Sequence, residues 1–182
     1  MAAMTTEMWL IAVVRLLGAL PVLRWPFYGA LIAIAVDFSD LFIMNLVDLG
    51  GVDHYQTFDK YLDQAYLLTF LVVALTRWRG YERGVAAGLY AYRFAGFVAF
   101  ELTQARAVLL LFPNFFEPWF VLIAARHEFG LEQRLAGRRL VALCVLLAAL
   151  KLAQEYAIHR LRLLDGFTAV EAVEAIWDFV TP

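Results

Sequence analysis

Residues 27–47 read FYGALIAIAVDFSDLFIMNLV, a stretch that is long and apolar enough to cross a membrane yet carries Asp37 and Asp40 inside it. A transmembrane helix needs about 20 mainly apolar residues. An ionised carboxylate in hydrocarbon is costly and is retained mainly where it faces a polar cavity, a partner charge or a metal. The stretch therefore predicts a membrane helix that also contributes to a polar site inside the protein.

Outward from this stretch, other apolar segments are expected to be transmembrane helices. They cover residues 8–23, 58–78, 85–112, 115–129 and 140–164. Apolar and acidic side chains alternate at helical spacing between residues 168 and 180, which predicts an interfacial amphipathic helix in the tail 166–182. We therefore expect one all-α integral membrane domain over residues 1–182, with about six transmembrane helices in one bundle and a C-terminal amphipathic helix.

The composition agrees with a membrane protein. Hydrophobic residues make up 63% of the chain and the mean hydropathy is +0.70, outside the usual range of soluble domains. A net charge of −2 gives no basic field for nucleic acid, so no nucleic-acid partner is expected. No positive region precedes the first apolar segment, so we expect that segment to be retained and not removed as a signal peptide. Membrane lipids are the expected partners, and the expected location is a prokaryotic cytoplasmic membrane.

Four aspartates are candidates for one site. Asp37 and Asp40 are three residues apart and Asp59 and Asp63 are four apart, so each pair shares a helix face. If the two helices pack as an antiparallel pair, the carboxylates converge and need a cation or protons. Oxygen donors favour a hard ion such as Mg²⁺ or Mn²⁺. The alternative for the second pair is that both residues lie at a helix N-terminus, where negative charge is favoured.

This spacing resembles a known signature. Asp37-x-x-Asp40, eighteen intervening residues and then Asp59-x-x-x-Asp63 are similar to the motif of the CDP-alcohol phosphatidyltransferases, in particular of phosphatidylglycerophosphate-synthase-like enzymes. Arg15 resembles the arginine of the family's N-terminal segment. The resemblance covers the residues up to about 80.

The resemblance implies roles for the aspartates. Asp37, Asp40, Asp59 and Asp63 would hold Mg²⁺ or Mn²⁺, and Asp63 would also act as the general base toward an acceptor hydroxyl. It further implies a transferase of phospholipid synthesis and pairing of the chain into a homodimer.

Other positions of the signature carry different residues. Leu41 replaces a glycine, Met44 and Asn45 replace an alanine and an arginine, and Tyr55 replaces a second glycine. The small residues would make room for the nucleotide, and the arginine would bind its phosphate. The sequence therefore predicts altered or lost CDP binding beside a retained set of metal ligands.

Polar residues elsewhere are candidates for substrate binding. These are Asn45, at the position of the family's arginine, and Arg93 and Arg106 in the segment 85–112. The two arginines could bind a phosphate, or either could pair with Glu101 within the bundle.

The distribution of arginines bears on orientation. If all segments span, the positive-inside rule places the turn between the aspartate pairs outside the cytoplasm. In the family this turn faces the cytoplasm. Either segment 8–23 or segment 115–129 does not span, or the orientation has changed, or the resemblance is only architectural.

These observations leave three functions open. The first is a divergent transferase with a metal-carboxylate site. The second is a catalytically inactive scaffold or subunit on the same fold, in which the aspartates pair with arginines such as Arg93 or Arg106. The third is a small cation or proton transporter that uses the carboxylates as a relay.

Overall fold

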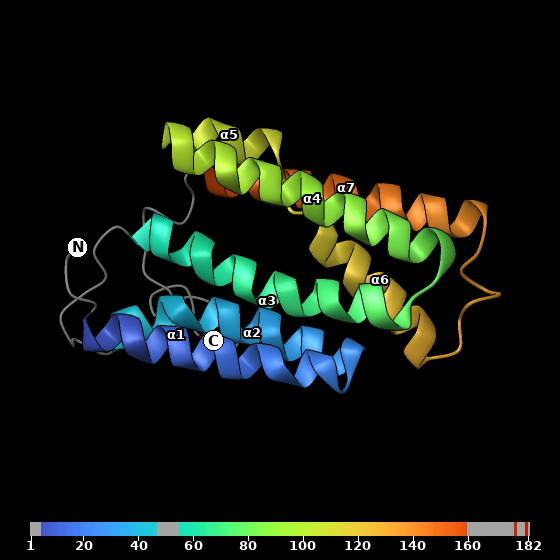
Figure 1. Cartoon of the computed structure of the whole chain (residues 1–182), viewed down its shortest axis with the longest axis horizontal. Helices are drawn as coiled ribbons and strands as arrows, with labels where there is room; N and C mark the ends of the chain where they lie inside the picture. Colours follow the sequence, from blue (N-terminus) through green and yellow to red (C-terminus); the bar gives the residue numbers. More distant parts are fainter. Residues whose placement is uncertain (1–4, 47–54, 160–176, 178–180, 182) are drawn as a thin grey trace.

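The computed structural model describes residues 5–46, 55–159, 177 and 181, and all regular structure in them is helical. The elements are α1 Thr6–Ala19, the 3-10 helix η1 Leu20–Leu23, α2 Pro26–Leu46, α3 Tyr55–Arg77, α4 Gly80–Thr103, α5 Arg106–Leu111, α6 Phe116–Glu128 and α7 Arg138–His159 (Figure 1). For this part of the chain the all-α prediction is confirmed.

Two of the described helical stretches are long and apolar enough to cross a membrane, Thr6–Leu23 and Gly80–Thr103. A buried helix of a soluble protein or a signal sequence can satisfy the same criterion. The bundle of about six transmembrane helices therefore stays a prediction. The tail 166–182 lies outside the described residues, apart from residues 177 and 181.

The long helices run along one common direction and define two ends of the bundle (Figure 1). The turns that follow α1, α3 and α6 lie at one end, which we call the arginine end because it carries Arg24, Arg79 and Arg134. The end of α2, the start of α3 and the end of α4 lie at the other, which we call the aspartate end. Helices far apart in the chain therefore present their termini together.

The predicted continuous span 85–112 is wrong. Helix α4 ends at Thr103, and Gln104 adopts a left-handed conformation with φ 54° that ends the helix. Helix α5 then folds back on α4, where Tyr92 Oη donates to the carbonyl of Leu111. The sequence pointed to the later proline as the break, whereas the backbone reverses earlier because this return packs against α4.

The large aromatic side chains of the core lie between α3 and α6. Phe70, Phe116 and Phe120 are fully buried, and the rings of Phe70 and Phe120 stack with centroids 4.2 Å apart. Leu67 and Ile123 are also fully buried beside them. This apolar layer separates the polar groups at the two ends of the bundle.

Gly29 is required where α2 passes η1. A Cβ at Gly29 would lie 2.3 Å from the backbone nitrogen of Val22 and 2.4 Å from the carbonyl carbon of Pro21. Backbone atoms cannot move aside as a flexible side chain can. By contrast, a Cβ at Gly88 of α4 would meet nothing within 4 Å.

These two glycines give a matched pair of variants. Gly29→Ala should destabilise the protein by about 1 to 3 kcal/mol because the bundle must separate α2 from η1 to fit the methyl group. Gly88→Ala should leave stability unchanged or raise it by up to about 1 kcal/mol, as expected for alanine in a helix. Thermal unfolding in detergent, followed by circular dichroism, measures both. Equal melting temperatures for the two variants would contradict the close approach.

Candidate functional site

Three of the predicted aspartates converge inside the bundle, between the middle of the long helices and the aspartate end. Asp37 comes from α2, and Asp59 and Asp63 come from one face of α3. One carboxylate oxygen of each lies within 4.8 Å of the others. The backbone of Asp40 belongs to α2, but its side chain is outside the described set. The spacing of four residues in α3 explains why its two carboxylates project together.

Arg15 of α1 lies among these carboxylates. Its Nη1 donates to Asp59 Oδ1 and its Nη2 to Asp63 Oδ1, each at 3.0 Å, and Nη2 also contacts Asp37. The arginine side chain is only 3% exposed. One guanidinium therefore joins α1 to both aspartate-bearing helices through charge-assisted hydrogen bonds.

Two further cations complete the cluster. Lys60 Nζ lies 2.5 Å from Asp59 Oδ2 and 3.1 Å from Asp63 Oδ2. Arg93 of α4 places Nη2 3.7 Å from Asp63 Oδ2, while its Nη1 donates to the carbonyl of Phe112 at 2.9 Å. Among the described side chains, the three carboxylates thus face three cations. A buried group of charges that balances in this way avoids the cost of an unpaired ion.

Sequence reasoning placed Arg93 at the site but missed Arg15 and Lys60 as members. The sequence could have indicated the contact of Lys60 with Asp63, because a lysine three residues before an aspartate lies on the same helix face. For Arg15 the indication was weaker, and consisted only of a charged residue within an apolar segment. Its aspartate partners are 22 or more residues away in the chain, so only the packing of α1 could reveal them.

The remaining candidates are only partly described. The side chains of Asn45 and Arg106 lie outside the described set. Glu101, one possible partner of these arginines, accepts a hydrogen bond from Tyr61 Oη at 3.3 Å. Arg93 faces Asp63.

A second polar group begins one turn along α3 from Asp63. Tyr66 Oη donates to Glu117 Oε2 at 2.7 Å, and Lys151 Nζ of α7 lies 3.5 Å from Glu117 Oε1. Asn114 accepts from the backbone N–H of Glu117 at 3.3 Å. These contacts tie the start of α6 to α3 and α7, and the hydrogen bond to Asn114 satisfies one of the backbone N–H groups in the first turn of α6.

A third ionic group lies at the arginine end. Arg126 contacts Glu82 and also donates to Tyr81 Oη at 2.7 Å, and His127 Nε2 lies 2.8 Å from Glu82 Oε2. Glu132 lies in the loop after α6. A hydrogen bond from the backbone N–H of Glu132 to its own carboxylate, together with a hydrogen bond from His127, lowers the pKa of this side chain. This group fastens α6 to the first turn of α4.

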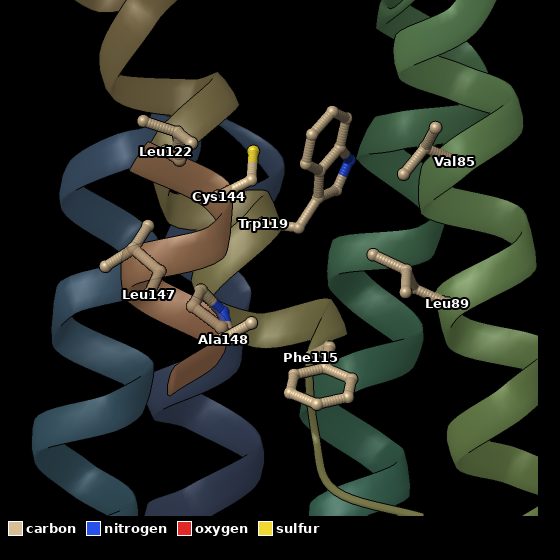
Figure 2. Close-up of a pocket in the computed structure, with 9 residues that line it drawn as sticks. Val85, Leu89, Phe115, Trp119, Leu122, Cys144, Leu147 and Ala148 are labelled. Atoms are coloured by element: carbon tan, nitrogen blue, oxygen red, sulfur yellow. The ribbon is translucent and has the colours of Figure 1, made fainter. Parts of the chain in front are cut away.

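An apolar cavity of about 270 Å³ lies apart from the charged cluster, between α4, α6 and α7 (Figure 2). Val85 and Leu89 border it from α4, and Leu147 borders it from α7. Trp119 lines it from α6, and its buried indole Nε1 has no hydrogen-bond partner among the described residues. None of the described residues that line the cavity is acidic or basic, so they offer no ligand set for the predicted metal.

The charged cluster suits a hard divalent cation by its donor set. Three carboxylate oxygens within 4.8 Å of one another match the ligands that Mg²⁺ and Mn²⁺ prefer. Arg15 already bonds to all three carboxylates, so a metal would share these ligands with the guanidinium or displace it.

Comparison of the chain with protein-family models, with curated proteins and with solved structures finds no match.

The contacts of Arg15 predict a large effect on stability. Arg15→Gln should cost about 3 to 5 kcal/mol, because it leaves neighbouring carboxylates without their shared counter-ion. Arg24→Gln is the control, since Arg24 is exposed beyond η1 and its removal should change stability by less than about 0.5 kcal/mol. Unfolding midpoints in detergent distinguish the two. A melting temperature unchanged in Arg15→Gln would show that the carboxylates do not depend on this arginine.

Proposed function

We propose that the chain is an integral membrane protein related to the CDP-alcohol phosphatidyltransferases, in which the carboxylate cluster binds Mg²⁺ or Mn²⁺ and serves transfer of a phosphoalcohol or phosphatidyl group. The observation that carries this proposal is the convergence of Asp37, Asp59 and Asp63, from two helices, at positions that match the family motif. Such a protein would function among membrane lipids, and the family resemblance implies a homodimer.

Exposed apolar side chains support the membrane location. On α1 these include Trp9 at 58%, Leu16 at 50% and Leu17 at 61% exposure. On α7 they include Val145 at 64%. Large continuous apolar surfaces are unfavourable in water, and hydrocarbon is a solvent in which they cost little.

The mixed charges of the cluster suit an anionic substrate. A divalent cation, when bound, would neutralise phosphate charge and stabilise the leaving group. Asp63 would accept the proton of the acceptor hydroxyl, and Lys60 and Arg93 would orient the phosphate. Because both cations now contact Asp63, substrate binding would have to draw them away from that carboxylate.

One observation favours a second function. Arg15 binds all three carboxylates, and together with Lys60 and Arg93 it balances their charge, so the described cluster is neutral without any metal. This arrangement suits an inactive membrane scaffold or subunit whose aspartates only hold the helices together. The third function, a proton or cation relay, finds less support. A relay needs a polar path, whereas Leu67, Phe70 and Val73 make the buried face of α3 apolar beyond Tyr66.

Metal titration separates the first two functions. Purified wild-type protein should bind Mn²⁺ stoichiometrically, and Asp59→Asn and Asp40→Asn should each weaken binding by at least about tenfold. Glu101→Gln is the matched control, because this carboxylate lies at the same end but outside the cluster. Isothermal titration calorimetry or manganese electron paramagnetic resonance gives the affinities.

The opposite result is equally informative. Folded wild-type protein that binds neither Mn²⁺ nor Mg²⁺ would contradict the transferase and support the scaffold. In that case Asp63→Asn should change only the melting temperature.

A further inference from the structure

The exposed positive charge of the described chain gathers at one end. Arg24 follows η1, Arg77 and Arg79 flank the turn between α3 and α4, and Arg134 and Arg138 lie in or after the loop behind α6. All five side chains are exposed. These three turns lie at the same end of the bundle in Figure 1, so the five exposed arginines belong to one end, which we call the basic surface.

The described cations of the carboxylate cluster are far less exposed than these arginines. Arg15, Lys60 and Arg93 are 3%, 14% and 5% exposed and face the carboxylates. Their charge is neutralised within the protein. Among the side chains that the structure describes, every exposed lysine or arginine therefore belongs to the arginine end.

The path of the chain keeps the two ends on opposite sides. Helix α5 and helix α6 are both too short to cross a bilayer of about 30 Å alone. Together with the stretch 112–115 they return the chain from the aspartate end to the arginine end, as one broken pass (Figure 1). The non-helical stretch is held inside the protein, where Arg93 binds the Phe112 carbonyl and Asn114 is 4% exposed. Irregular backbone at membrane depth is tolerated under this condition.

We infer that the arginine end lies on the cytoplasmic side against anionic phospholipid headgroups, and that the carboxylate cluster faces the opposite side of the membrane. This inference rests on the membrane location in the proposed function. Short loops rich in arginine remain in the cytoplasm, and the anionic cytoplasmic leaflet attracts them by about 1 kcal/mol per residue. The basic surface and the lipid headgroups are complementary in charge.

The orientation narrows the substrate class. A nucleotide-linked donor arriving from the cytoplasm would meet the arginine end, with the apolar layer around Phe70 between it and the carboxylates. The sequence agrees, because Leu41 and Asn45 replace the small and basic residues that would accommodate a nucleotide. The ligand of the cluster is then a lipid phosphate without a nucleotide.

Cysteine labelling tests the orientation in the full chain. Cys144, the single cysteine, is first replaced by alanine. Ala105→Cys then places a thiol beside the end of α4, and Ala136→Cys places one in the loop before α7; both positions are exposed. Neither change removes a charge. Cells are treated with a membrane-impermeant maleimide, intact or after permeabilisation.

The expected result is that Ala105→Cys reacts in intact cells, whereas Ala136→Cys reacts only after permeabilisation. The reverse pattern, or the same reactivity of both thiols in intact cells, would overturn the inference. Alkaline extraction of the membrane fraction keeps this outcome separate from the proposed function. Protein released by extraction contradicts the membrane location, whereas inserted protein with the wrong labelling pattern contradicts the orientation alone.

Discussion

The guanidinium of Arg15 bonds to carboxylates from two other helices, and the packing of the aspartate end depends on it. Each of these charges would be costly to bury alone. Removal of any one of them would leave a buried charge without its counter-ion. The arginine therefore sets how α1 lies against α2 and α3. Lys60 and Arg93 neutralise the remaining negative charge, and the contact of Arg93 with Asp63 joins α4 to α3.

The same balance constrains what the site can do. The oxygens that would bind a metal or accept a proton are the oxygens that the cations now hold. A ligand must supply interactions at least as favourable, which an anionic phosphate with its divalent cation can do because it offers both signs of charge. Under the proposed function, stability and function would compete for one set of atoms, as is common at functional sites.

The ends of the bundle are chemically separate. Between them lies the layer around Phe70, Phe116 and Phe120, and the broken pass through residues 112–115 runs beside it. Arg93 joins this break to the carboxylates through the Phe112 carbonyl. Movement of the break would therefore alter the cluster.

The amino-acid sequence by itself determined the helical class, most helix positions and the face shared by Asp59 and Asp63, because apolar periodicity and residue spacing are local properties. It also supplied the unequal distribution of arginines. Only the tertiary structure decided the partner of each charge and the early reversal at Gln104. Arg15 meets Asp63 across 48 positions of the chain, and Gln104 takes its left-handed conformation where α5 packs back on α4. Such contacts depend on how whole helices pack, and no local pattern records that.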